Sequence, residues 1–337
     1  MSETLPPPPL SGSGEPLLPD HSPPAGESNA TAVAAPATST APAAEGVSQA
    51  GEMRPMTPPL RLALSTFAEN KLAVASAVVL LLIVAFCFAG PLIYHTNQTA
   101  SSLITANLPP RAQFPLGTTP NGRDELGRLM VGGQSTLEVG FAVAIFATAF
   151  GLVWGLVAGY FGGFADAVLM RIVDAMLSIP FLFFVVLLAS LITPNLILII
   201  LVITSVSWLS TARLVRGEAL SLRTRDYVHA AEAFGARPPR ILFRHITPNL
   251  LGVVVVNGTL KVADSILLFA SIGYLGLSVP PPATSWGVIL TAGINNLFDG
   301  YWWQLWPAGF LIVITVLAFA VLGDGLRDVV ERRLQKR

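Results

Sequence analysis

Lys261 and Asp264 lie three residues apart inside the apolar run 250–277, which otherwise carries no charge. On a helix this spacing puts both side chains on one face, where they neutralise each other. Ionisable groups at membrane depth are rare and mark ion or substrate pathways. The pair fits a proton relay, the lining of a pathway, or a contact that fixes helix packing. No His or Glu chain continues it, which favours the last two.

The other reactive side chains form no recognisable catalytic or metal site. The histidines are scattered over a tail and loops, which gives neither a zinc triad nor a serine triad: His21, His95, His229 and His245. A single cysteine, Cys87, excludes an internal disulfide and a Cys-pair zinc site. The segment GRDELGR at 122–128 lacks the glycine spacing and the Lys-Ser/Thr of a phosphate loop. We therefore expect this chain to bind no cofactor and to draw energy from another chain or from an ion gradient.

The elements that position these residues are predicted to be membrane helices. Hydrophobic residues make up 53% of the 337 positions and charged ones 12%, so the chain requires lipid as solvent. The formal net charge is zero, which gives no general attraction to nucleic acid. Residues 1–57 are rich in Pro, Ala, Ser, Gly and Thr and predict a disordered tail. We read it as a cytoplasmic extension rather than a proline-rich binding arm.

Six apolar runs are each near or above the roughly 20 residues that a helix needs to cross a bilayer. They are 72–93, 137–160, 172–192, 196–214, 250–277 and 305–322. None alternates with a period of two, so helices are expected rather than barrel strands. Pro180 should kink the third helix, because it removes a hydrogen bond and crowds the preceding turn.

Basic residues set the expected orientation, since they accumulate on the cytoplasmic side. With both termini inside, sixteen of the twenty Lys and Arg residues fall in cytoplasmic segments. The expected external loop 94–136 holds three, and the last external loop, 278–304, holds none. The expected parts are the tail 1–57, a basic segment and first helix at 58–93, the loop 94–136, a core of five helices at 137–325, and a cytoplasmic end at 326–337.

The most informative polar segment is the loop 213–248, which predicts two short helices. Gly235 is placed to end the first in a left-handed conformation, and Pro238 can open the second. The second helix has an apolar stripe and a basic stripe, and suits a membrane interface or a partner's groove. The apolar stripe holds Ile241, Leu242 and Ile246, and the basic one Arg240, Arg244 and His245. Arginines that serve only topology are the alternative. The small residues Ala230, Ala231 and Gly235 favour a docking site, since they let a partner approach closely.

The stretch YVHAAEAFGARPPRILFRHITPN within this loop resembles the EAA loop of permease subunits in bacterial ATP-binding-cassette (ABC) importers. Three other segments extend the match, at 115–140, 273–287 and 322–333. Residues 60–337 thereby resemble the C-type permease of dipeptide and oligopeptide importers. His229 departs from the motif, which usually has Glu there.

The resemblance implies an all-α membrane protein with six transmembrane helices and a cytoplasmic two-helix coupling loop, the type I ABC importer permease fold. It implies a multi-pass protein of the bacterial inner membrane, partnered by a second homologous permease subunit, two ATPase subunits that hold ATP and Mg, and an external substrate-binding protein. The chain itself would be a non-catalytic subunit. Cargo other than peptides (nickel, glutathione or glycosides), a stand-alone secondary transporter, and a membrane scaffold without transport remain alternatives. The residues implied in ATPase coupling are Arg225, Asp226, His229, Ala230, Ala231, Phe234, Gly235, Arg237, Arg240 and Arg244.

Three smaller expectations concern helix contacts and the external side. Gly151, Gly155 and Gly159 recur every four residues and predict close helix packing, for instance against a second permease. Four tryptophans near the external helix ends predict a belt at the membrane interface: Trp286, Trp302, Trp303 and Trp306. The segment with Gly117, Gly122, Arg123 and Asp124 predicts a salt-bridged external cap.

Overall fold

The computed structural model describes residues 67–96, 100–191 and 195–335. The expected tail 1–57 lies outside these residues, as does the basic segment up to residue 66. Within the described ranges the chain is built from helices and loops, with two isolated β-bridges and no longer strand. The all-α prediction is confirmed.

Five helices of the described residues are long and apolar enough to cross a membrane. These are α2 (Lys71–Phe88), α4 (Glu125–Phe161), α7 (Leu196–Arg223), α10 (Thr247–Tyr274) and α12 (Trp306–Gln335). Short helices join them: α3 (Gly90–Ile93), α8 (Asp226–Ala233), α9 (Pro238–Ile241) and α11 (Trp286–Asn296). Single turns complete the set: η1 (Leu103–Thr105), η2 (Leu242–Ile246), η3 (Leu297–Asp299) and η4 (Trp302–Gln304).

The candidate for the sixth span is a bent pair of helices. It consists of α5 (Gly163–Leu177) and α6 (Phe181–Leu191), which are bent by 80° at the break. Pro180 lies in the break, as its missing N–H and bulky ring require. The predicted start at residue 172 is wrong, because Asp166 and Arg171 hid the first nine residues of α5, 163–171, from an apolar search.

Helix α4 begins twelve residues before the expected start at 137, so the end of the predicted loop 94–136 is helical. Asp124 caps it, with its Oδ1 accepting a hydrogen bond from the Leu126 backbone N–H at 2.9 Å. At 37 residues the helix is about 55 Å long, well beyond a hydrocarbon core of about 30 Å. It therefore projects out of the bilayer.

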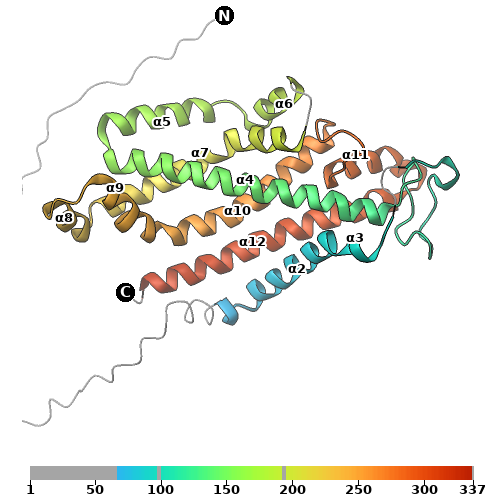
Figure 1. Ribbon diagram of the computed structural model, residues 1–337, viewed down its shortest axis with the longest axis horizontal. Helices are drawn as coiled ribbons and strands as arrows, with labels where there is room; N and C mark the ends of the chain where they lie inside the picture. The colour runs from blue at the N-terminus through green and yellow to red at the C-terminus, as the bar shows by residue number, and fades with distance from the viewer. Residues whose placement is uncertain (1–66, 97–99, 192–194, 336–337) are drawn as a thin grey trace, which may run out of the picture. The chain divides into compact units, whose positions relative to one another are not determined.

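Helix α4 packs against α7 and α10, and α12 packs against α10 and α2 (Figure 1). The close approach of α4 to α7 depends on its glycines. A Cβ on Gly155 would lie 2.5 Å from the Ala212 carbonyl oxygen, and one on Gly151 2.8 Å from that of Trp208. The expected close packing is confirmed, but these glycines contact α7 of the same chain rather than a second permease.

The bundle has two distinct ends (Figure 1). The start of α2, the end of α12, and the short helices α8 and α9 lie at one, which we call the loop end. The segment 100–124 and α11 lie at the other, which we call the opposite end. The loop end gathers the basic residues of the 223–244 segment together with Lys71 and Arg327.

Candidate functional site: a docking loop at one end of the bundle

The predicted loop 213–248 is shorter than expected at both ends. Helix α7 continues past residue 214 to Arg223, so Arg213 and Arg216 lie on a helix. Arg216 donates to both carboxylate oxygens of Asp166 on α5, at 2.5 and 2.6 Å. Arg213 reaches Asp174 at 2.5 Å. These arginines join α5 to α7, a role that positive-inside counting did not show because the partner aspartates are 39 and 50 residues away.

The first short helix ends as predicted. Helix α8 stops at Ala233, and Gly235 follows in the left-handed region with φ of +77°. The Ala236 N–H donates to the Ala231 carbonyl at 3.0 Å and the Gly235 N–H to that of Glu232 at 2.9 Å. This arrangement satisfies carbonyls that the helix end leaves open. It also turns the chain sharply toward α9.

The second predicted helix exists, but it is not separate from span five. Pro238 opens α9 as expected, and the chain then passes through a π turn at Leu242–Ile246 directly into α10. Pro248 has no N–H to donate and crowds the preceding turn, which a wider turn relieves. Pro238 to Tyr274 is therefore one 37-residue helical rod.

The apolar stripe of this second helix faces its own chain. Ile241, Leu242 and Ile246 are buried, in one cluster with Leu156 of α4 and Val215 of α7. The predicted use of this stripe against a membrane interface or a partner's groove is therefore wrong. The basic stripe keeps Arg240 and Arg244 exposed, with His245 half-buried.

Helix α8 is anchored on one side and open on the other. Val228 is fully buried against the same cluster. Glu232 accepts a hydrogen bond from the Tyr160 hydroxyl of α4 at 3.3 Å, and His229 Nδ1 lies 3.7 Å from Glu232 Oε2. These contacts fix a short helix that projects from the bundle.

The open side of α8 carries most of the residues implied in coupling. Phe234 is 92% exposed, so its own chain leaves almost the whole ring uncovered. Nothing lies within 4 Å of a Cβ built on Gly235. Ala231 is half-buried, and the remaining exposed members are Arg225, Asp226, His229, Ala230, Arg237, Arg240 and Arg244. We call Ala230, Phe234 and Gly235 with these neighbours the docking surface. It offers a protruding ring, small residues and charges, which suits contact with another protein.

Lys261 and Asp264 meet as predicted, with Lys261 Nζ 3.2 Å from Asp264 Oδ2. They lie on α10, far along the helix from the docking surface. The lysine side chain is 13% exposed and the aspartate side chain 66%. Among the described residues no group of three His, Cys, Asp or Glu side chains is arranged to hold a metal.

The opposite end is held together by hydrogen bonds. Gly117 and Gly122 adopt positive φ, at 72° and 69°, where the chain turns before α4. Gln304 donates to the Thr118 carbonyl at 2.9 Å, which ties this segment to η4. The salt-bridged cap expected from Arg123 and Asp124 stays a prediction. Trp286 is wholly buried, with its indole N–H on the Leu129 carbonyl at 2.9 Å.

The belt prediction is therefore wrong for two of the four tryptophans. Trp303 is also buried, and its indole N–H lies 3.4 Å from the Thr118 carbonyl. Only Trp302 and Trp306, at 53% and 50% exposure, present surfaces that a membrane interface can contact. A tryptophan near a helix end can be buried in the protein or exposed at the membrane interface, and composition alone does not distinguish the two.

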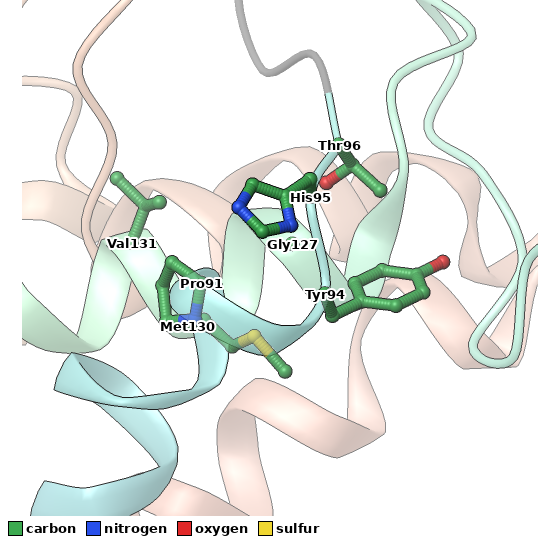
Figure 2. A pocket seen from close by; sticks show the side chains of 7 residues that line it. All are labelled: Pro91, Tyr94, His95, Thr96, Gly127, Met130 and Val131. Atoms are coloured by element: carbon green, nitrogen blue, oxygen red, sulfur yellow. The ribbon is translucent and has the colours of Figure 1, made fainter.

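Two pockets at the opposite end were not predicted from the sequence. One, of about 300 Å³, lies between α3 with the residues after it and the first turns of α4 (Figure 2). Its wall includes Tyr94, whose hydroxyl donates to the Asp124 carboxylate; burial first, and then this carboxylate, raises the pKa of Tyr94. The second, of about 210 Å³, is lined by the buried Glu125 and Arg128. Both lie away from the docking surface.

An all-α membrane bundle with a protruding, anchored loop fits the permease class of transport protein, and the family comparison assigns the chain to that class. The model of the binding-protein-dependent transport system inner membrane component matches residues 151–336. The model of the N-terminal transmembrane domain of oligopeptide transport permease C matches 58–110. The chain belongs to the dipeptide and oligopeptide branch of this ABC permease family.

Similar proteins cover most of the chain. The oligopeptide transport system permease protein OppC of Escherichia coli K12 is 40% identical over 79% of this chain and 88% of its own length. OppC of Bacillus subtilis is 37% identical over 81% and 90%. The dipeptide permease DppC of the same organism is 37% identical over 80% and 84%.

A solved structure agrees on the fold. The MetNI methionine ABC transporter, in an inward-facing conformation, contains a chain that aligns with a TM-score of 0.51 and 24% identity. The match covers 60% of this chain and 96% of that one. The type I ABC importer permease fold is thereby confirmed, and the family match with the long apolar helices makes this a multi-pass membrane protein.

Proposed function

We propose that this permease subunit forms half of a translocation pathway and couples it to ATP hydrolysis through the docking surface. The observation that carries the proposal is helix α8, which is fixed by Val228 and Glu232 on one side and exposes Phe234 and Gly235 on the other. An anchored protrusion transmits force, whereas a slack loop absorbs it. In this proposal the docking surface binds a cleft on an ATPase subunit.

The proposed assembly contains a second homologous permease subunit, two ATPase subunits and an external substrate-binding protein. The ATPase subunits hold ATP and Mg, and this chain binds no cofactor and catalyses no reaction. ATP stabilises the closed ATPase pair, and the docked helices then shift the bundle toward its outward-open arrangement. Membership of the ABC permease family removes the stand-alone secondary transporter as a competing reading.

The proposed orientation places the loop end in the cytoplasm together with both termini. The basic residues at that end support it, since they accumulate on the cytoplasmic side. The opposite end, with α11 and the segment 100–124, then faces outward and receives cargo.

Peptides are the proposed cargo. The names of the similar permeases, for oligopeptides and dipeptides, support peptides over nickel, glutathione or glycosides. Selection of the individual peptide rests with the binding protein in this scheme.

Reconstitution in liposomes tests the proposal. The assembled importer should take up a tripeptide only with its binding protein and ATP, and a variant ATPase unable to hydrolyse ATP should stop uptake. Nickel, glutathione and a glycoside serve as competing cargo in the same vesicles. Uptake by this chain alone under a proton gradient would overturn the proposed function.

A further inference from the structure

A polar stripe runs along one face of α10 at membrane depth. Asn257, Lys261, Asp264 and Ser271 are spaced by four, three and seven residues, which places them in one row of the helix. From first to last the row spans about 21 Å at 1.5 Å per residue, most of a hydrocarbon core of about 30 Å. Most of the polar side chains in the membrane part of α10 lie on this face.

The charge that this stripe presents outward is acidic. Lys261 is covered by its own chain at 13% exposure, while the carboxylate of Asp264 is 66% exposed. Lys261 donates to Oδ2 at 3.2 Å. No residue that the structure describes donates a hydrogen bond to the other oxygen, Oδ1. The pair is neutral in sum, yet its accessible part is a hydrogen-bond acceptor.

Lipid does not suit this face. A carboxylate exposed to the centre of a bilayer costs about 2.5–3.5 kcal/mol on insertion scales. Half a turn around the same helix, Val255 is 54% exposed and Leu251 49%, as expected of a lipid-facing side. The side of α10 with Val255 and Leu251 therefore suits lipid, whereas the side with Asp264 requires a polar environment.

A tightly packed helix interface does not suit the stripe either. Helices that pack closely in membranes place small residues at the contact, as α4 does with Gly151 and Gly155 against α7. The stripe instead carries Lys261, Asp264 and, in the same row, Leu268. At the first end of the row, Asn257 accepts a hydrogen bond from the Thr211 hydroxyl of α7 at 2.9 Å, so its own chain covers that end. Asp264 and Ser271 are exposed, and a water-filled space satisfies them without close contact.

We infer that the exposed part of the stripe, Asp264 and Ser271, lines the pathway between the two permease subunits and that Asp264 offers Oδ1 to the ammonium group of a peptide in transit. This inference rests on the proposed function. The neighbouring Lys261 weakens the attraction, which suits a site that cargo must leave as well as enter.

Cysteine labelling tests whether the stripe meets water. Cys87 is the only cysteine of the chain and is fully buried, so we expect the natural chain to show little labelling by thiol reagents. In the liposome-reconstituted importer, Asp264→Cys should react with a membrane-impermeant sulfonate-bearing methanethiosulfonate. Val255→Cys, on the other face and about 14 Å along the helix axis, should react at least about tenfold more slowly. Equal rates at the two positions would overturn the inference.

Charge preference tests the ammonium site. Leu267, one turn from Asp264 and 46% exposed, is replaced by Cys. An aminoethyl methanethiosulfonate, which carries a primary ammonium, should react there faster than the sulfonate reagent. Adding Asp264→Asn should lower the ammonium-to-sulfonate rate ratio about three- to tenfold, as expected for a charge about 6 Å away. An unchanged ratio would refute the role of Asp264.

The two proposals fail in different ways. ATP-dependent uptake in the same liposomes together with an unchanged ratio removes the ammonium site and leaves the permease function standing. Uptake that does not depend on ATP removes the permease function itself. Asp264→Asn should lower tripeptide uptake and Asp264→Glu should restore it, because the carboxylate is what the cargo meets.

Discussion

Gly235 shows how much of the docking surface depends on single residues. Its φ of +77° is one that residues with a Cβ rarely adopt, and its surroundings are open. The strain of a substitution there is of order 1 kcal/mol and does not by itself prevent folding. Any larger functional loss must come from what the new side chain does to a partner.

Gly235→Asp should abolish ATP-driven uptake while membrane insertion persists, because a carboxylate would project into the ATPase contact. Co-purification of the ATPase subunits and tripeptide uptake measure this. Gly300→Asp is the matched control, since Gly300 also has a positive φ, of +91°, and open space around it, but lies at the opposite end. Wild-type uptake by Gly235→Asp would show that α8 is not the coupling element.

Phe234 offers a second test at this scale. At 92% exposure its ring contributes little to the fold of the isolated chain, so Phe234→Ala should leave the melting temperature within about 2 °C of wild type. If the ring fills a pocket on the ATPase, the affinity of the ATPase subunits should fall by at least about tenfold, the 1–2 kcal/mol or more typical of a buried aromatic anchor. An unchanged affinity would place the contact elsewhere on the loop.

At the scale of helices, α4 and α7 share the most extensive contact between any two helices that the structure describes. Gly155→Ala would place its Cβ 2.5 Å from a backbone carbonyl oxygen, which forces the helices apart. We expect a loss of about 1–3 kcal/mol in unfolding free energy, measured by thermal unfolding in detergent. Gly217→Ala on α7, where a Cβ meets nothing within 4 Å, should instead stabilise by about 0.5–1 kcal/mol. A neutral Gly155→Ala would mean that the glycines do not set this spacing.

The ion pairs between α5 and α7 should differ in strength. Asp166 is 15% exposed and binds Arg216 through two hydrogen bonds, whereas Arg213 and Asp174 are both 51% exposed. A double-mutant cycle on unfolding should give a coupling of about 1–2 kcal/mol for the first pair and under about 0.5 kcal/mol for the second. Equal couplings would contradict the assignment of the Arg216 pair as the main link.

Features that depend only on neighbouring residues in the chain could be predicted from the sequence. Features that depend on contacts with residues far away in the chain could not. Gly235, Pro238 and the spacing of Lys261 and Asp264 needed only nearby residues. The start of α5 was misplaced because the sequence does not show that the charge of Asp166 is paired with Arg216, fifty residues away. The buried side of Ile241, Leu242 and Ile246 likewise could not be assigned, because an apolar stripe does not say whether its own chain or a partner covers it.

At the scale of the whole molecule, orientation remains a prediction with a direct test. A cysteine at Gly235 should be labelled only from the cytoplasmic side of spheroplasts, and one at Gly300 only from outside. The physical reason is the concentration of Lys and Arg at the loop end. The reverse pattern would invert the proposed topology and separate the docking surface from any ATPase.

The continuity of Pro238 to Tyr274 has a bearing on timing. The helix that leaves the docking loop is the one that carries Asp264, and between them lies only the π turn at Leu242–Ile246, in which the Thr247 N–H still donates to the Leu242 carbonyl. A signal that arrives at one end of a continuous rod reaches the other without a separate step. In a working importer, closure of the ATPases and reorientation of the Asp264 carboxylate would then be simultaneous. The cargo would lose its binding site at the moment when the pathway opens to the other side of the membrane.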